Sequence, residues 1–331
     1  MILLIIFVFT FVFYQAYSIS QYDYIIKHSG TSTVAVDTNG TIVKQDNDSS
    51  VVINYVIQTL NTKGSGTAFV KNDSPYQCKS VIYLLSNVDL YGDNTKLINY
   101  NVLQWFIVSP NNQILYKTKM IGFDIDGKNN SHAIDIYSVQ RSKFDVTIRN
   151  SYSALVIDTQ NKTTPIETIL QQNSAFSEYN LKIDNATIGI GLTGTLNYFT
   201  TDNKFDTIIM TNISGWGIDF SQWCDSNYFG YTFIETSKNS TVGVMFNPWG
   251  NVVNGVYDEH FDDLVIDNWG SGAIGVDMKY TYHNTIDHLY GSIWGGTTGN
   301  ILFKDEYATS YIVNDMVNLK HYEKGIMDIK L

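Results

Sequence analysis

Short runs of alternating apolar and polar residues recur along the second half of this 331-residue chain. Many of them begin with a small residue, as in "GIGL" from Gly189, "GIDF" from Gly217 and "GVDM" from Gly275. A second strand-like run precedes most of these, as in "FDTIIMTN" from Phe205 and "FDDLVIDN" from Phe261. Alternation with a period of two predicts β-strands, and the pair of strands returns about every 27 residues.

One residue separates the two strands of each repeat and keeps its register along the chain. This corner position holds Gly127, Asn150, Asn185, Asn212, Thr236, Asn268 and Gly291. Gly and Asn reach positive φ at the least cost, so we expect a corner with a left-handed backbone. A second aligned position holds Phe144, Phe205, Phe229 and Phe261, which predicts inward rings stacked from one repeat to the next.

Repeats of this length, with short strands and no helical period, predict an all-β fold, a β-solenoid of about eight coils. Variable loops between the strand pairs would absorb the differences in repeat length. A propeller is the main structural rival. Its four-stranded blades run to about 40 residues or more, which fits the spacing less well.

The first half of the chain contains one clear amphipathic helix, in "DNDSSVVINYVIQTLN". Its candidate N-caps and its apolar positions are Asp48, Ser49 and Ser50, then Val52, Ile53, Val56, Ile57 and Leu60. A helix of about three turns in this place would cover the open end of the first coil, which solenoids need. We expect a short N-terminal capping helix.

The apolar run 2–14 is too short for a bilayer span, which needs about 20 residues. It resembles a secretory signal, with Ala16 and Ser18 before the expected cleavage point. We divide the chain into a signal peptide 1–18, N-terminal strands with the capping helix 19–62, and a parallel β-helix 63–331. The protein is then expected to be secreted, extracellular or on a cell or virion surface, without a stable membrane span after cleavage. An uncleaved anchor stays open because the basic region of a signal peptide is missing.

Composition excludes one class of partner and leaves two other questions open. The net charge is -11 and the only arginines are Arg141 and Arg149, so nucleic acid is rejected as a partner. Cys78 and Cys224 could form one disulfide or remain two buried thiols. Glycosylation sequons, which suit an exported glycoprotein, begin at Asn39, Asn47, Asn72, Asn129, Asn161, Asn185, Asn212 and Asn239.

The helix followed by "GTAFVK" and "PYQCKSVIYLLSNVDLYGDNTKLI" resembles the opening of the pectin-lyase-like superfamily of right-handed parallel β-helices. Many members are secreted polysaccharide lyases or hydrolases, and many are viral tailspikes. The resemblance implies right-handed coils and a polysaccharide or cell-surface glycan as partner. It leaves open whether the chain is an enzyme, since this fold carries both enzymes and inert fibres.

The sequence departs from the motifs of the best-defined enzymes in that superfamily. Of the polygalacturonase motifs it contains only Asp262-Asp263. In "TIDH", Thr285 stands where pectate lyases have Trp, and no arginine follows Arg149. An arginine-based lyase mechanism is therefore disfavoured.

The repeat register still brings acidic residues together. Asp262 and Asp287 follow the inward apolar residue in adjacent coils, so their carboxylates are expected about 5 Å apart. Asp263 would then neighbour His288. We take these four residues as catalytic candidates for glycoside cleavage. No cofactor is required, although the same oxygens could hold calcium, and the plainer alternative is a solvated acidic edge.

Four tryptophans beside glycines are the candidate glycan-binding residues: Trp216, Trp249, Trp269 and Trp294. Their faces could stack on sugar rings, or they could cover the side of the solenoid or a subunit interface. With the acid pair they would line one groove.

Two functions follow from this reading of the sequence. The first is a secreted β-helix that binds an extracellular polysaccharide; the stronger version of this hypothesis is that it also cleaves the polysaccharide. The alternative is a non-catalytic structural or adhesive module of a fibre, tailspike or envelope. The end of the chain at "GIMDIKL" looks like an uncovered coil strand, so we expect a homo-oligomer, with a trimer as one form.

Overall fold

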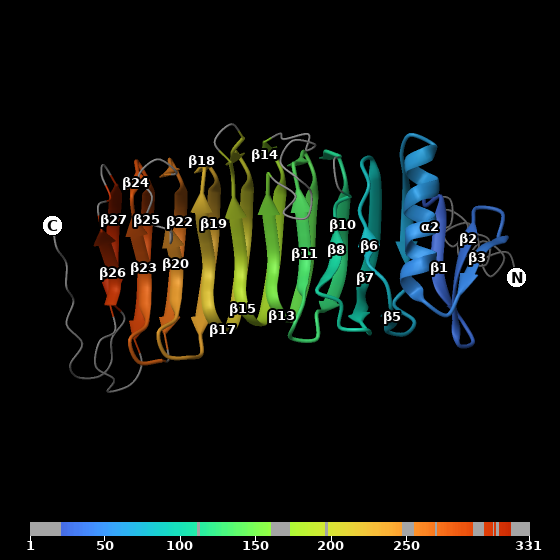
Figure 1. Cartoon of the computed structure of the whole chain (residues 1–331), viewed down its shortest axis with the longest axis horizontal. Coiled ribbons are helices and arrows are strands. Elements are labelled where there is room, and N and C mark those ends of the chain that lie inside the picture. Colours follow the sequence, from blue (N-terminus) through green and yellow to red (C-terminus); the bar gives the residue numbers. More distant parts are fainter. Residues whose placement is uncertain are drawn as a thin grey trace, which may run out of the picture.

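The computed structural model describes residues 21–110, 113–159, 173–195, 198–246, 255–268, 270–293, 301–306, 308 and 311–318. These residues form a stack of coils with the N-terminal strands at one end and the last strands at the other (Figure 1). The coils are built of parallel strands, as β-solenoids require and as propeller blades do not allow. The predicted all-β solenoid is confirmed.

Each coil passes through three faces. Face 1 contains β4 (Gly66–Val70), β5 (Tyr76–Cys78), β7 (Val88–Asn99), β10 (Lys119–Asp126), the first parts of β13 (Lys143–Asp158), β15 (Glu178–Thr193) and β17 (Lys204–Gln222), then β19 (Tyr228–Thr236), β22 (His260–Asn268), β25 (Thr285–Ile293) and β27 (Ile312–Asn318). Face 2 contains β6 (Ile82–Tyr83), β8 (Trp105–Val108), β11 (His132–Tyr137), the second parts of β13, β15 and β17, then β20 (Val242–Phe246), β23 (Ile274–Lys279) and β26 (Ile301–Glu306).

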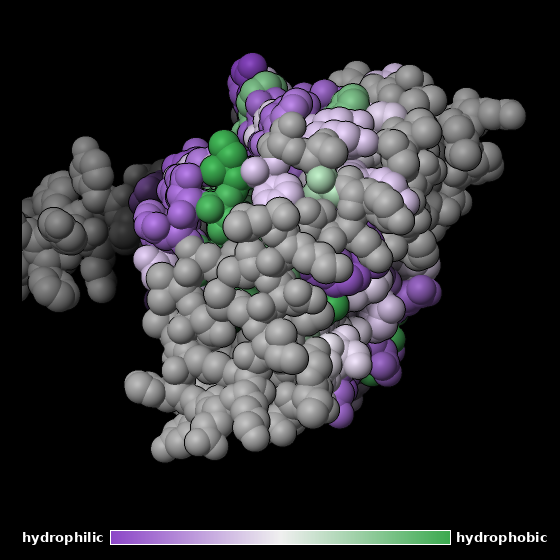
Figure 2. All heavy atoms as spheres, turned by 90° about the vertical axis from the view of Figure 1, so that its left-hand side faces the viewer, coloured by the Kyte–Doolittle hydropathy of each residue, from purple (hydrophilic) through white to green (hydrophobic). Residues whose placement is uncertain are grey.

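Face 3 is a separate seven-stranded sheet of two-residue strands. Its strands are β9 (Leu115–Tyr116), β12 (Val139–Gln140), β14 (Ser174–Ala175), β16 (Thr200–Thr201), β18 (Cys224–Asp225), β21 (Val256–Tyr257) and β24 (Thr281–Tyr282). Seen from the C-terminal end, the described surface is mainly hydrophilic, with smaller hydrophobic areas between (Figure 2). The apolar side chains lie inside the coils.

The predicted phenylalanine column is confirmed and contains one further ring. Phe144, Tyr179, Phe205, Phe229 and Phe261 stack in successive coils, with ring centroids 5.5, 4.7, 4.4 and 4.4 Å apart. Each is fully buried. Such stacking contributes about 0.5–1.5 kcal/mol per pair beyond the burial of the rings, so the column fixes the register between coils.

The predicted left-handed corner is confirmed at three asparagines. It is wrong for Gly127 and Thr236, which do not have positive φ, and for Gly291, which pairs with Ile266 before the corner. Asn150, Asn185 and Asn212 have φ values of 50, 58 and 57°. The side-chain amide of Asn185 donates to Oδ1 of Asn150 at 2.9 Å, and that of Asn212 donates to Oδ1 of Asn185 at 3.3 Å. Two of the sequons therefore begin at residues whose side chains belong to this ladder.

The small residues that begin the face 2 strands are required by the distance between coils. A Cβ atom on Gly189 would lie 2.5 Å from the carbonyl oxygen of Gly217, and one on Gly217 would lie 2.4 Å from that of Gly243. The same holds for Gly243 against Gly275, at 2.6 Å. Glycine at these positions lets successive backbones approach.

A second corner, between faces 3 and 1, has a left-handed backbone without any glycine. Its residues have φ between 50 and 61° and are Asn87, Lys117, Arg141, Phe176, Asp202, Ser226, Asp258 and His283. The backbone N–H groups bond to the next coil, as Lys117 does to the carbonyl of Gln140 at 3.0 Å. Such bonds offset the cost of about 1–2 kcal/mol for each strained residue, so this corner accepts many residue types.

The capping helix α2 (Ser49–Thr62) lies across the N-terminal end of the coils, beside the antiparallel strands β1 (Tyr24–Ser29), β2 (Ser32–Asp37) and β3 (Ile42–Asp46) (Figure 1). Its predicted apolar face is buried. Asp48 is the N-cap and accepts from the Ser50 N–H at 3.0 Å and from the Lys79 N–H of the first coil at 2.8 Å. Burial acts to raise the pKa of Asp48, but these hydrogen bonds outweigh it and hold the pKa below its usual value.

The two cysteines are free, buried thiols, so the disulfide alternative is wrong. In the described part of the chain, no helix has the length and apolar character to cross a membrane. The expected signal peptide 1–18 and the segment "GIMDIKL" lie outside the described residues.

Candidate functional site

A β-bulge in face 1 brings the catalytic candidates to the surface. Regular alternation would turn one of two consecutive residues inward. In β22, however, Phe261 and Leu264 are the buried residues, and Asp262 and Asp263 between them are 42 and 47% exposed. Relative to β15, the extra residue enters the register at β17, opposite Tyr179 and Asn180. Bulges occur often beside functional sites, because they re-aim side chains.

The same spacing recurs in β25. Ile286 and Leu289 are buried, and Asp287 and His288 between them are 34 and 44% exposed. Since Phe261 pairs with Ile286 and Asp263 with His288, the outward pairs of the two strands lie side by side. The structure therefore brings together all four catalytic candidates.

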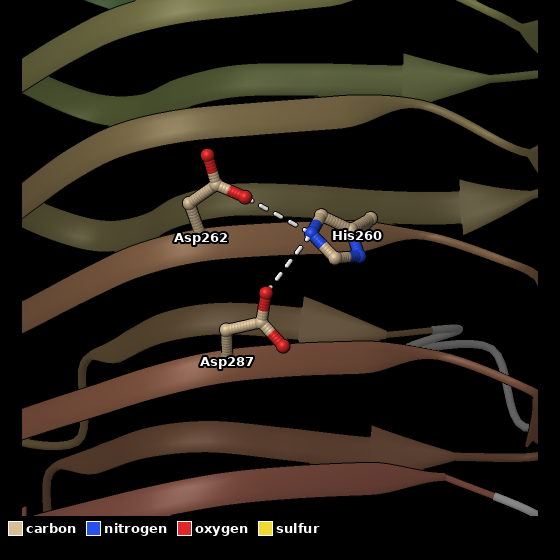
Figure 3. Close-up of side chains that lie close together, drawn as sticks. All are labelled: His260, Asp262 and Asp287. Atoms are coloured by element: carbon tan, nitrogen blue, oxygen red, sulfur yellow. Dashed lines mark hydrogen bonds and ion pairs between the residues drawn. The ribbon is translucent and has the colours of Figure 1, made fainter.

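The four candidates form two clusters rather than one. In the first, the His260 ring joins the two carboxylates (Figure 3). Its Nε2 atom lies 3.0 Å from Oδ1 of Asp262 and 3.4 Å from Oδ2 of Asp287. One nitrogen and two carboxylate oxygens lie within 4.8 Å of one another. His260 was not among the residues selected from the sequence.

Neighbouring strands orient this first cluster. The Tyr228 hydroxyl, on β19, donates to Oδ2 of Asp262, and this hydrogen bond raises the pKa of Tyr228 to about 12. The ring of Tyr228 stacks on that of His260, with centroids 5.5 Å apart. On β27, the side-chain amide of Asn314 donates to Oδ1 of Asp287 at 2.7 Å. Both carboxylates thus have a neutral donor on their outer side.

The second cluster lies beside the first on the same strands. The Nδ1 atom of His288 is 3.1 Å from Oδ1 of Asp263, as the register predicts, and its Nε2 atom is 3.8 Å from Oδ2 of Asp315 on β27. Asp315 is a further acid that sequence reasoning missed. Across the two clusters, the ring nitrogens of two histidines therefore contact four aspartates on three strands.

Aromatic side chains accompany these clusters on face 1. Tyr231 of β19 is 45% exposed and pairs with Asp263 in register. Further along the strands, Phe233 pairs with Val265, and Val265 pairs with Tyr290. The face thus offers rings beside carboxylates, a combination that suits the apolar faces and hydroxyl groups of sugars.

Glu259, next to His260 in sequence, points the opposite way. It is fully buried and belongs to a polar column at the second corner, with Ser142, Ser177, Asn203, Asn227 and Asn284 in the other coils. Asn227 donates to Oε1 of Glu259 at 2.9 Å, and the Glu259 N–H donates to Asn284 at 2.9 Å. Burial raises the pKa of Glu259 well above its usual value. The neutral side chain of Glu259 is therefore part of the buried polar column and not of the surface site.

Of the four tryptophans, only Trp216 lies in the described residues. It follows the Asn212 corner and pairs with Val242 on face 2. It therefore does not share a face with Asp262, and the single groove expected from the sequence is not formed by Trp216. Trp249, Trp269 and Trp294 lie outside the described residues.

His260, Asp262 and Asp287 are the described residues that could hold a metal ion. A calcium ion takes about six to eight oxygen ligands, and this set offers two carboxylates and an imidazole nitrogen. Imidazole nitrogen with carboxylate suits a transition metal better. The donor set is therefore a poor match to the calcium site considered from the sequence.

Comparison with known proteins supports the fold. The sequence matches no protein-family model, and no curated protein matches it. Among solved structures, a 1,3-alpha-1,4-beta-D-galactose-4-sulfate-3,6-anhydro-D-galactose-2-sulfate 4 galactohydrolase matches with a TM-score of 0.58 and 11% identity, over 81% of this chain and 82% of that one. The chain is a right-handed parallel β-helix.

Two further solved structures match with lower TM-scores. The tailspike protein of E. coli bacteriophage HK620, in complex with a pentasaccharide, has a TM-score of 0.41 and 9% identity, over 84% of this chain and 65% of that one. PfbA, a surface adhesin of Streptococcus pneumoniae, has a TM-score of 0.40 and 13% identity, over 77% and 83%.

Proposed function

We propose that this β-helix is a secreted protein that binds a polysaccharide on the outer side of face 1 and hydrolyses its glycosidic bonds with Asp262 and Asp287. The observation that carries the proposal is the convergence of these two carboxylates, from adjacent coils, on the Nε2 atom of His260. Glycoside hydrolysis needs two such groups, one as acid and one as base or nucleophile.

The closeness of the pair favours one of the two stereochemical courses. The carboxylate oxygens lie within 4.8 Å of each other. Inverting enzymes keep their carboxyl groups about 6.5–9.5 Å apart to admit a water molecule, and retaining enzymes keep them about 5–5.5 Å apart. One aspartate would attack the anomeric carbon while the other protonates the leaving oxygen, and water would then release the product with its configuration retained.

The neighbouring residues have supporting roles in this proposal. Tyr228 and Asn314 hold the carboxylates in position through the hydrogen bonds described above. His260 supplies an N–H that both carboxylates share. Asp263 and His288 would bond to sugar hydroxyl groups beside the cleaved bond, and Tyr231 offers an exposed ring for stacking.

Two further observations support the proposal without deciding it. The solved structure with a TM-score of 0.58 is a galactohydrolase, so this fold is compatible with hydrolysis of a galactan. The N-terminal apolar run suits export to where polysaccharides are found. The alternative, a structural or adhesive module without catalysis, agrees with the missing polygalacturonase and pectate lyase motifs.

A panel of neutral, sulfated and uronic-acid polysaccharides, assayed for new reducing ends and for unsaturated products, tests the proposal. We expect new reducing ends without unsaturated products, and a loss of at least about 1,000-fold in rate in Asp262→Asn and Asp287→Asn. Asp145→Asn, the same change elsewhere on face 1, is the matched control and should keep full activity. Binding without cleavage, weakened by Tyr231→Ala, would support the adhesive alternative instead.

A further inference from the structure

A hollow at the N-terminal end of the coils collects positive charge in a chain whose net charge is -11. Its volume is about 470 Å³, within the usual range of about 300–1,000 Å³ for ligand pockets. Lys117, Lys119 and Arg141 line it, with Asp89 as the single acid among the lining residues. One of the two arginines of the chain is therefore placed here.

Two neighbouring columns of residues build this hollow. Asn87, Lys117 and Arg141 occupy successive coils of the corner between faces 3 and 1, each with positive φ. Their backbone N–H groups bond from coil to coil, for example Arg141 to the carbonyl of Ala175 at 3.1 Å. Lys119 comes from the adjoining strand column. The fixed backbone thus presents three cationic side chains to one space.

Gly66 lines the hollow, and Leu60 and Asp23 leave no room for a side chain on it. A Cβ atom at this position would come 2.4 Å from Leu60 and 2.8 Å from the carboxylate of Asp23. Thr67, beside it, pairs in register with Asp89, and Asp89 pairs with Lys119. The Thr67 hydroxyl lies 3.3 Å from the Gln21 carbonyl and 3.3 Å from the Asp23 carboxylate, the two acceptors of its hydrogen bond.

The positive charges are only partly neutralised. The ammonium group of Lys119 lies 2.7 Å from Oδ2 of Asp89. Among the described residues, Lys117 and Arg141 form no ion pair. Instead, the ammonium group of Lys117 lies over the Tyr116 ring, 5.1 Å from its centroid. Both side chains are exposed at the corner, and no carboxylate in the described part of the chain pairs with these two like charges on adjacent coils.

We propose that this hollow is a binding site for a tetrahedral oxyanion, a phosphate or sulfate group, with Arg141 and Lys117 as its principal ligands. The planar guanidinium fork of Arg141 matches two oxygens of such a group, and Lys117 adds a point charge. The site is separate from Asp262 and Asp287, which lie several coils away, and does not depend on the hydrolysis proposed for them.

Calorimetric titration of the full chain with sodium sulfate and sodium phosphate, at constant ionic strength set with sodium chloride, tests this site. The double variant Lys117→Gln/Arg141→Gln should lower the affinity at least about tenfold, the effect of one good charged hydrogen bond. Asp89→Asn removes the competing carboxylate and should raise the affinity about threefold. Lys238→Gln, which removes one positive charge elsewhere, should change nothing.

A second pair of titrations separates two sources of the group. Oligosaccharides of equal length, with and without sulfate or phosphate esters, are compared with the free ions. Tighter binding of the esterified sugar assigns the site to a substituent on a glycan, and equal binding assigns it to the free ion; both support the site. Equal affinities in the wild type and the double variant, or an equal loss in Lys238→Gln, would overturn it. The gain expected for Asp89→Asn keeps the test valid even if the double variant fails to fold.

Discussion

Two pairs of aspartates on face 1 have opposite surroundings. In β10, Asp124 lies 2.9 Å from Nε of Arg149, and Asp126 lies 3.5 and 3.7 Å from the ammonium groups of Lys128 and Lys96. In the later coils, no lysine or arginine of the described residues forms an ion pair with Asp262 or Asp287, and β19, β22, β25 and β27 contain neither residue.

This difference separates structural acids from acids that remain free to react. A fixed cation beside a carboxylate holds it in place, as in β10. The partners of Asp262 and Asp287 are a histidine, a tyrosine hydroxyl and an amide, which can exchange their hydrogen bonds for those of a ligand. Both places contain two acids. The candidate site differs from the β10 pair in that the described partners of its carboxylates are not lysine or arginine.

The largest expected difference between the two pairs is in stability. Asp126→Ala should lower the free energy of unfolding by about 2 kcal/mol, because it leaves Asn150 and the Lys128 N–H without their acceptor. Asp262→Ala, at an exposed position, should change it by less than about 0.5 kcal/mol. Urea unfolding followed by circular dichroism measures both. Equal losses of unfolding free energy in the two variants would contradict the difference between the two pairs of aspartates.

The next effect is the pH dependence of stability, which has opposite signs for Asp126 and Glu259. Burial acts to raise the pKa of Asp126, but the Asn150 and Lys128 hydrogen bonds and the nearby ammonium groups hold it below 3.8. Its stabilisation is present above about pH 3.8 and is lost as the pH falls through the lowered pKa. For Glu259, burial raises the pKa above 4.5. Its stabilisation is present below about pH 4.5 and is lost as the pH rises.

Unfolding free energies measured from pH 3 to 9 check these signs. Each group contributes a slope of at most about 1.4 kcal/mol per pH unit. Glu259→Gln keeps an acceptor for Asn227 and should reduce the decline above pH 4.5, while Asp126→Asn should flatten only the acid side. Asp225 and Asp258 lie near Glu259 and also oppose its ionisation. A decline that persists unchanged in Glu259→Gln would contradict the assignment.

The smallest effect concerns Tyr228, the donor to Asp262. In Asp262→Asn the carboxylate charge disappears, and the pKa of Tyr228 should fall from about 12 toward its ordinary value of 10.0. Nuclear magnetic resonance of Cζ-labelled tyrosine follows this titration. Asp124→Asn, which alters the β10 pair, serves as control and should leave it unchanged. An unshifted Tyr228 in Asp262→Asn would show that the hydrogen bond does not form in solution.

The coil pattern was readable from the sequence because inward positions repeat the same chemistry. The aligned phenylalanines predict their column, at Phe205, Phe229 and Phe261. The aligned asparagines predict the corner, at Asn150, Asn185 and Asn212. Tyr179 of the same column was missed because it is a tyrosine where the other coils have phenylalanine. The polar column of Glu259 was also missed, although each of its members stands two residues before an inward apolar residue.

The candidate site was only partly readable, because a bulge changes which residues point outward. The signal was present: Phe261 and Leu264 are three apart, whereas Phe144 and Val146 are two apart. That spacing turns both Asp262 and Asp263 outward, and the ring of His260 then contacts Asp262 and, in the next coil, Asp287. The position of Trp216 was not readable, because a residue just past a corner belongs to the next face.

The corner between faces 3 and 1 has a consequence for how such proteins diverge. Its shape is imposed by backbone hydrogen bonds and not by residue type, so Lys, Arg, Phe, Asp, Ser and His all occupy it. Mutations at this corner can change the charge of the surface while the coils stay intact. Ligand preference is then able to drift much faster than architecture, which agrees with a shared fold at 11% identity.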